Sequence, residues 1–162
     1  MPGKTNTSAL PLVVGVGILL SIVGASLYFA YRPAAPSPNN GQYPGWAAGG
    51  EPVTTPSGLK YYDIEVGTGR RPAGPANQVR VHYTGYLVDG TKFDASADHG
   101  GPQTFGLSGV VPGFAEGILS MNVGGKRKII IPPSLGYGPQ AQGRIPPNST
   151  LVFDIELLAV LD

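Results

Sequence analysis

The sequence contains no cysteine and only two histidines, His82 and His99. Without cysteine there is no disulfide framework, no thiolate metal site, no cysteine nucleophile and no lipid-modified cysteine. His82 alternates with apolar residues in a strand pattern, which turns it outward, and His99 has no ligand spacing to any partner. We therefore expect no metal and no cofactor.

Charge is also scarce. The chain has 11 Lys and Arg against 10 Asp and Glu, for a net charge of +1, and charged residues make up 13% of it. Such a balance gives no strong attraction to a phosphate backbone, so no nucleic-acid partner is expected. No Gly-x-Ser-x-Gly elbow or other nucleophile-and-base set stands out.

The longest stretch without any charged residue runs from Leu10 to Tyr31. As a helix, its length of about 33 Å would cross a bilayer core of roughly 30 Å. We predict a transmembrane helix over 10–31, preceded by an N-terminal tail, 1–9. Because Lys4 precedes the run and only Arg32 directly follows it, we expect a cytoplasmic N-terminus and an exported C-terminal part, in a periplasm or a thylakoid lumen.

Two alternatives concern this apolar run. A cleaved signal peptide would use the small residues Val23-Gly24-Ala25 and release a soluble protein, although the run is long for a signal peptide. If the run is retained, Gly17, Ser21 and Ala25 form a stripe of small residues that could pack against another membrane helix in a complex. A plain anchor that faces lipid is the other possibility.

Residues 32–55 read as a linker without a packed core. Proline recurs among Ala, Gly, Asn and Ser, which favours extended polyproline II conformation. Trp46, the single tryptophan, either docks on the following domain or on a membrane surface, or stays exposed.

Residues 56–162 are expected to form one α+β domain, an antiparallel sheet of five or six strands crossed by one short helix. Pro112 suits the helix start, Phe114, Ile118 and Met121 form one apolar stripe, and Gly124-Gly125 can end the helix. Alternation, β-branched runs and turn signals predict strands at 58–66, 78–87, 92–94, 104–107, 129–131 and 150–158.

Aromatic residues are the strongest candidates for a functional site. They come from separate elements and either line one concave apolar pocket or simply fill the core; pockets of this kind bind small apolar groups, of which proline is one. Asp94 ends a strand and is either a turn cap or part of that site, and Lys126–Lys128 is interpreted as a solvated strand start. The candidate aromatic residues are Tyr83, Phe93, Phe105, Phe114, Tyr137 and Phe153.

A series of short motifs runs in order through the C-terminal two-thirds of the chain. The ordered set resembles the FKBP-type peptidyl-prolyl cis-trans isomerases over nearly all of Gly58 to Leu161, and leaves residues 1–55 outside. The motifs are Val81-His-Tyr-Thr-Gly85, Asp89-Gly-Thr-Lys-Phe-Asp94, Val111-Pro-Gly-Phe114, Met121-Asn-Val-Gly-Gly-Lys-Arg-Lys128, Ile131-Pro-Pro133, Leu135-Gly-Tyr-Gly138 and Ile145-Pro-Pro-Asn-Ser-Thr-Leu-Val-Phe-Asp154.

The resemblance implies a curved half-barrel sheet that wraps one short helix, with a proline pocket between them. Phe114 would form its floor, where many members have Trp, and the Val111 N–H and the Tyr137 hydroxyl would hold peptide or macrolide carbonyls. Gln103 stands where a Phe is usual and would make one wall more polar. Carried over by position, the catalytic set is Tyr83, Phe93, Asp94, Phe114, Tyr137 and Phe153, and the substrate-binding set is Phe105, Val110, Val111 and Ile145.

The implied activity is isomerisation of Xaa–Pro bonds in exported or membrane proteins. An apolar pocket favours the twisted, less polar transition state over the planar amide without any acid or base. We therefore expect a flat pH–rate profile, proline-containing polypeptides as partners, and macrolides as possible inhibitors. The competing hypothesis is a catalytically weak binding module that serves as an assembly factor or as a subunit of a membrane complex.

Overall fold

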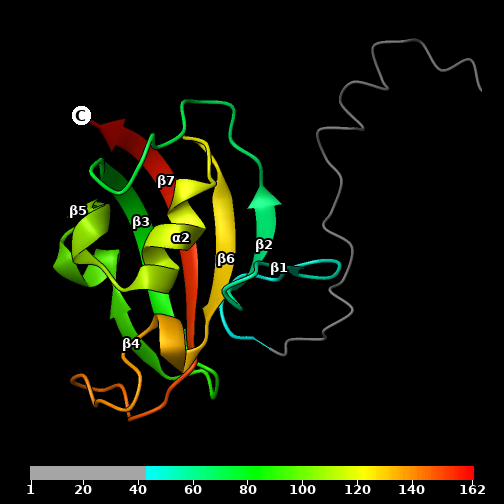
Figure 1. Cartoon of the computed structure of the whole chain (residues 1–162), viewed down its shortest axis with the longest axis vertical. Helices are drawn as coiled ribbons and strands as arrows, with labels where there is room; N and C mark the ends of the chain where they lie inside the picture. The colour runs from blue at the N-terminus through cyan, green and yellow to red at the C-terminus, as the bar shows by residue number, and fades with distance from the viewer. Residues whose placement is uncertain (1–42) are drawn as a thin grey trace, which may run out of the picture. The chain divides into compact units, whose positions relative to one another are not determined.

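A single antiparallel sheet of seven strands carries the structure, a computed structural model that describes residues 43–162 (Figure 1). The strand order is β1-β2-β6-β7-β3-β4, and β5 pairs with β3 beside this path. The strands are β1 (Val53–Thr54), β2 (Lys60–Glu65), β3 (Gln78–Leu87), β4 (Lys92–Ala95), β5 (Gln103–Gly106), β6 (Lys126–Ile131) and β7 (Leu151–Leu161).

The two long strands β3 and β7 form the centre of the sheet. Their register runs from Gln78 opposite Leu161 to Leu87 opposite Leu151, with one bulge after Arg80. Successive side chains of a strand point to opposite faces, so strict alternation of apolar and polar residues fixes which face is buried. The strand predicted at 78–87 is confirmed at both ends.

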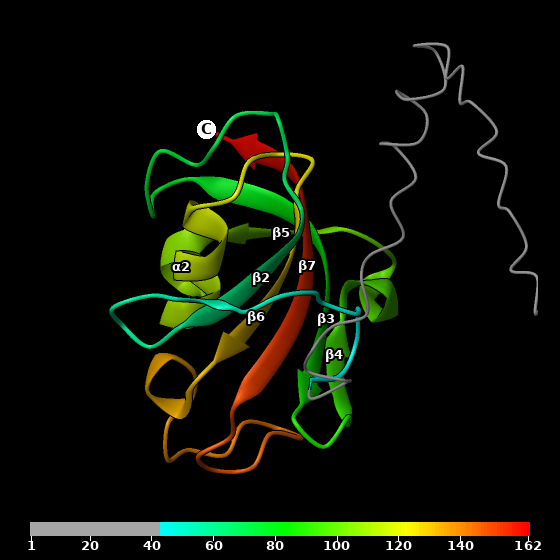
Figure 2. The same cartoon turned by 90° about the vertical axis from the view of Figure 1, so that its right-hand side faces the viewer.

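One face of the curved sheet holds helix α2 (Pro112–Leu119), as Figures 1 and 2 show. Pro112 is its first residue, where the missing N–H costs nothing. Phe114 and Ile118 point into the core and are 5% and 0% exposed. The predicted α+β architecture, with one short helix on an antiparallel sheet, is confirmed.

The predicted helix end and the predicted number of strands were wrong. The helix ends at Leu119, with Ser120 as its C-terminal cap, so Gly124 does not end it. Gly124 instead takes a φ of 87° in the turn that leads into β6, while Met121 stays buried although it lies beyond the helix. The sheet has seven strands rather than five or six, because the two-residue β1 pairs with β2 and is too short to show any sequence period.

The opposite face of the sheet is covered by the chain's own N-terminal strap, residues 43–48 (Figure 2). Ala48 packs there with outward-facing side chains of β2, β3, β6 and β7, and Tyr43 adds a partly buried ring. The predicted linker 32–55 is therefore wrong from Tyr43 onward. The outward faces of these strands are themselves apolar, which gives the strap a surface to bury; the side chains it meets are Tyr62, Ile64, Tyr86, Ile130 and Val152.

A buried ion pair fixes the strap to the sheet. Lys128 Nζ lies 2.5 Å from Asp154 Oδ1, and the two side chains are 1% and 3% exposed. Lys128 also donates a hydrogen bond to the Pro44 carbonyl, and the Trp46 N–H donates to Asp154 Oδ2 at 2.6 Å. Gly45 lies between them at a φ of 86°, where a Cβ would stand 1.9 Å from Asp154 Oδ2. The strap thus supplies hydrogen bonds that the buried charges require.

The prediction of a solvated strand start at Lys126–Lys128 is wrong for two of the three residues. Lys126 is partly exposed and pairs with Glu65 at 3.3 Å, but Arg127 and Lys128 are 4% and 1% exposed. Their burial depends on carboxylates of neighbouring strands, Asp63 on β2 and Asp154 on β7. Local sequence carries no sign of partners so far away in the chain.

The predicted transmembrane helix 10–31 and its stripe of Gly17, Ser21 and Ala25 lie outside the described residues. Among residues 43–162, no helix has the length and hydropathy needed to cross a bilayer.

Replacing Lys128 with Met should lower the free energy of unfolding by about 3–5 kcal/mol, because it leaves the Asp154 carboxylate buried and unpaired. Urea unfolding followed by the fluorescence of Trp46, the only tryptophan, would also report release of the strap. Lys126→Met is the matched control on the same strand and should cost about 1 kcal/mol or less. Equal losses for the two variants would contradict a structural role for the buried pair.

Candidate functional site

Four aromatic rings meet between helix α2 and the sheet. Phe114 is at the centre, with its ring centroid 5.1 Å from Phe153, 6.1 Å from Phe105 and 6.2 Å from Tyr83. All three ring pairs are close to perpendicular, at 75° to 86°, which is a favourable arrangement for aromatic rings. Phe93 extends the cluster through Phe153 at 5.3 Å. The helix therefore supplies the base of an aromatic bowl, and three strands supply its walls.

Two adjoining cavities open above these rings. The first is about 440 Å³ and the second about 400 Å³, and they share Asp94, Tyr137 and Phe153. The first is lined by Tyr83, Asp94, Phe105, Gly109, Val110, Val111, Phe114, Tyr137 and Phe153. The second is lined by Phe93, Asp94, Tyr137, Gln142, Gly143, Arg144, Ile145 and Phe153. All ten residues that the sequence nominated for the site thus line one cavity or the other.

Asp94 provides the charged edge of the first cavity. Its Oδ2 accepts a hydrogen bond from the Tyr83 hydroxyl at 2.7 Å, and its Oδ1 accepts one from the Ala95 N–H at 2.9 Å. Nε2 of His99 lies 2.7 Å from the same Oδ1. Asp94 therefore caps the local backbone, as its predicted position at a strand end indicated, and also lines the site.

These contacts shift two pKa values. Burial, reinforced by the hydrogen bond to Asp94, raises the pKa of Tyr83 well above its ordinary value. Burial by itself would raise the pKa of Asp94, but hydrogen bonds from Tyr83 and His99 outweigh it, and the pKa of Asp94 lies below its ordinary value. At neutral pH the cavity therefore has an ionised carboxylate and a hydroxyl that keeps its proton.

His99 is the functional candidate that sequence reasoning missed. It is the last residue of a 3₁₀ turn, Ser96–His99, which folds the chain back toward Asp94 five positions earlier. Gln103 was expected to make a pocket wall more polar, but its carboxamide donates to the carbonyls of His99 and Gly101 instead, at 3.3 and 2.8 Å. It holds the loop and does not line either cavity.

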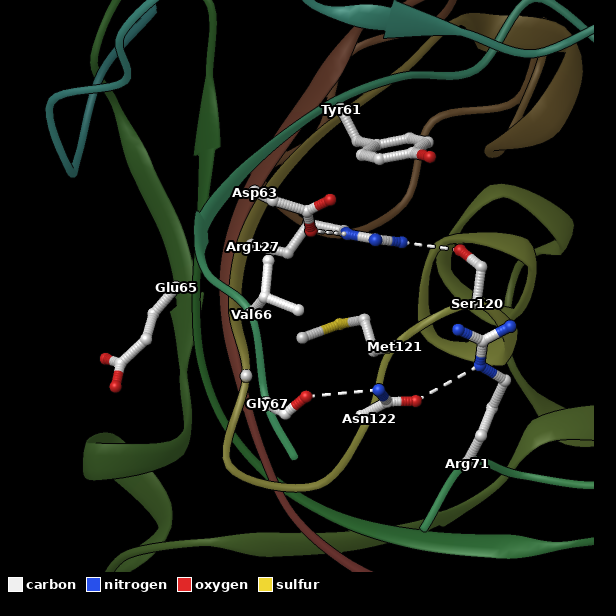
Figure 3. Close-up of a pocket in the computed structure, with 11 residues that line it drawn as sticks. Tyr61, Asp63, Glu65, Val66, Gly67, Arg71, Ser120, Met121, Asn122 and Arg127 are labelled. Atoms are coloured by element: carbon white, nitrogen blue, oxygen red, sulfur yellow. Dashed lines mark hydrogen bonds and ion pairs between the residues drawn. The ribbon is translucent and has the colours of Figure 1, made fainter. Parts of the chain in front are cut away.

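A third, polar cavity of about 310 Å³ lies at the other end of helix α2 (Figure 3). Arg127 lines it, and its Nε donates a hydrogen bond to Asp63 at 2.7 Å. Its Nη1 donates to Ser120 Oγ at 2.5 Å and to the Gly117 carbonyl at 2.8 Å. The guanidinium carbon lies 3.9 Å from the centre of the Tyr61 ring. These groups satisfy one another. The arrangement ties the C-terminal end of α2 to β2, and none of the predicted site residues lines it.

The chemistry of the aromatic site is that of binding and not of proton transfer. A concave, aromatic-lined cavity with a few polar groups at its edge takes a small apolar ring and fixes its orientation by hydrogen bonds. This combination defines a half-barrel binding protein whose pocket lies between one helix and a curved sheet.

The comparisons with known proteins identify which half-barrel family this is. A family model described as FKBP-type peptidyl-prolyl cis-trans isomerase matches residues 69–158. The chain belongs to that family.

Individual relatives agree with this family assignment. The chain is 51% identical over 107 residues to FkpA of Aeromonas hydrophila, which covers 66% of this chain and 40% of that protein. It therefore spans well under two thirds of the length of that relative. It is also 44% identical to a peptidyl-prolyl cis-trans isomerase of Schizosaccharomyces pombe, over 65% of this chain and 96% of that one.

Solved structures agree with the fold. FkpA from Escherichia coli superposes with a TM-score of 0.64 at 48% identity, over 67% of this chain and 51% of that one. AtFKBP13 gives a TM-score of 0.63 at 40% identity, over 68% of this chain and 98% of that one. The curved half-barrel that the motif series implied is thus present.

Asp94 should stabilise the folded protein at neutral pH, and this contribution should be lost at acid pH. Because its pKa is lower in the folded protein, this stability is fully present above the ordinary aspartate pKa of about 3.9 and is lost as the pH falls through the lower folded value. We expect Asp94→Asn to unfold at lower urea concentration than the unmodified protein at pH 7, with a difference that narrows at acid pH. A difference that widens below about pH 4 would show that the sign of the shift is wrong.

Proposed function

We propose that this chain catalyses the cis–trans isomerisation of Xaa–Pro peptide bonds. The observation that carries the proposal is the aromatic bowl: Phe114 at its base, with the rings of Tyr83, Phe105 and Phe153 around it, in a cavity large enough for a prolyl residue. Membership of the family and the full-length match to the fission yeast isomerase support it.

The physical basis is differential binding of the twisted amide. Rotation about an Xaa–Pro bond has a barrier of roughly 18–20 kcal/mol, because the planar bond has partial double-bond character. The twisted state has lost that resonance and is less polar. An apolar cavity therefore favours it over the planar amide, and catalysis needs only interactions that are stronger in the transition state. No proton is transferred, so kcat should not change with pH.

Within this mechanism the residues have distinct roles. Phe114 supports the pyrrolidine ring, and the hydroxyl of Tyr137, which lines both cavities, holds a carbonyl of the peptide. The Val111 N–H, at the start of α2, holds a second carbonyl. Phe93 and Ile145 line the adjoining cavity, where residues that flank the proline would lie.

The substrates would be exported or membrane proteins, and macrolides would compete for the same cavity. Support comes from the uncharged run 10–31, which would tether the isomerase domain to the exported side of a membrane. A relative from Legionella longbeachae, 45% identical over 109 residues, is named outer membrane protein MIP.

Replacing Phe114 with Ala should lower kcat/KM for a proline tetrapeptide on the order of tenfold or more, because the base of the cavity and three ring contacts are lost. It should also cost about 3–5 kcal/mol of stability. A protease-coupled assay on folded protein, checked by circular dichroism, measures the effect.

Ile118→Val is the matched control, since Ile118 is fully buried on the same helix but lines neither cavity. It should cost about 0.5–1.5 kcal/mol and leave turnover unchanged. Unchanged turnover in Phe114→Ala would exclude this cavity as the catalytic site. An unmodified protein that binds proline peptides without turnover would instead identify the competing function, a binding module.

A further inference from the structure

His99 contacts the charged edge of the first cavity through Asp94, although it lines neither cavity itself. Its Nε2 lies 2.7 Å from Asp94 Oδ1, and the two side chains are 51% and 39% exposed. Histidine is the side chain that ordinarily gains or loses its charge between about pH 5 and 8. In either form, His99 can donate Nε2–H to the carboxylate, but only the protonated ring offsets its negative charge.

The loop holds His99 in this position. Gly100 takes a left-handed φ of 85° directly after it, and the Gly101 N–H donates to the Ser96 carbonyl at 3.0 Å. The Gln103 carboxamide donates to the His99 carbonyl at 3.3 Å. These hydrogen bonds of the loop therefore hold the backbone of His99 in the position from which its side chain contacts Asp94.

The other charged and titratable groups around this contact are engaged elsewhere or stay constant near neutral pH. Lys92 and Asp98 form their own pair at 2.9 Å, and Tyr83 keeps its proton. His82 Nδ1 lies 2.9 Å from Ser96 Oγ, at the start of the 3₁₀ turn. The remaining groups that share a cavity with Asp94 are Tyr137 and Arg144.

We propose that His99 is a positioning residue that tightens substrate binding when it is protonated, because its imidazolium offsets the charge of Asp94 while a prolyl residue covers the cavity. The inference rests on the proposed function. An apolar group that covers the cavity removes water from the Asp94 carboxylate, which is costly for an ion. A charge-assisted hydrogen bond is roughly twice as strong as a neutral one and offsets more of that cost.

The consequence is a split between the two kinetic constants. The bound peptide covers Asp94 in both the ground state and the transition state, so the charge of His99 stabilises the two states equally. Such uniform binding changes KM and leaves kcat unaltered. KM should rise as the pH rises through the histidine range. For a half-exposed pair the expected change is about two- to fivefold.

The test is to measure kcat and KM between pH 5.5 and 8.5 for the full chain in detergent. An uncharged proline peptide, with exchange between its cis and trans NMR signals as the readout, avoids the pH dependence of a coupling protease. The dissociation constant of the same peptide is measured in parallel. We expect both KM and the dissociation constant to rise about two- to fivefold with pH, at constant kcat.

Three variants assign the effect. His99→Arg, whose guanidinium is always charged, should bind tightly at every pH. His99→Gln retains a donor without the charge and should bind weakly at every pH. His82→Gln, which alters the only other histidine, should retain the pH-dependent change in binding of the unmodified protein.

The inference is overturned if the dissociation constant of the unmodified protein does not change with pH. It is also overturned if the pH-dependent change persists in His99→Gln, or if it disappears in His82→Gln. A step in kcat alone would also overturn it. If the protein binds the peptide but shows no turnover at any pH, the proposed function fails, whereas the dissociation constants still decide the role of His99.

Discussion

The close approach of helix α2 to strand β6 sets the geometry of the site. Gly113 and Gly117 face the strand, and a Cβ at either position would come within 2.5 Å of Ile131 or 2.9 Å of Ile129. An eight-residue helix is too short to be stable alone, so it depends on this packing. Arg127 holds its far end to β2. Phe114 is thereby fixed at a depth that makes it the base of a cavity and not only a core side chain.

The sheet that supports the helix is itself covered on its other face. The strap 43–48 buries the outward side chains and completes the hydrogen bonds of the Lys128–Asp154 pair. Asp154 directly follows Phe153, which points to the opposite face and forms part of the aromatic bowl. Two successive residues of β7 therefore connect the cavity on one face to the strap on the other. The strap lies in the same compact unit as the cavity, although the family model begins only at residue 69.

Much of this arrangement could be predicted from the sequence where the signal is local or ordered. Alternation predicted the bounds of β3, and the ordered motifs nominated ten of the residues that line the two cavities. The strap, the burial of Arg127 and Lys128, and the contact of His99 with Asp94 escaped prediction. The first two depend on partners that the sheet brings from distant parts of the chain. The contact of His99 depends on a 3₁₀ turn that has no hydrophobic period.

The most direct test of the account is exchange NMR of an uncharged proline peptide with catalytic amounts of the full chain. We expect the cis and trans signals to exchange faster in proportion to protein concentration, and the amide signals of Val111 and Tyr137 to shift as the peptide binds. Shifts at these residues with exchange no faster than in the free peptide would contradict the central claim, because the cavity would then bind proline without favouring the twisted bond.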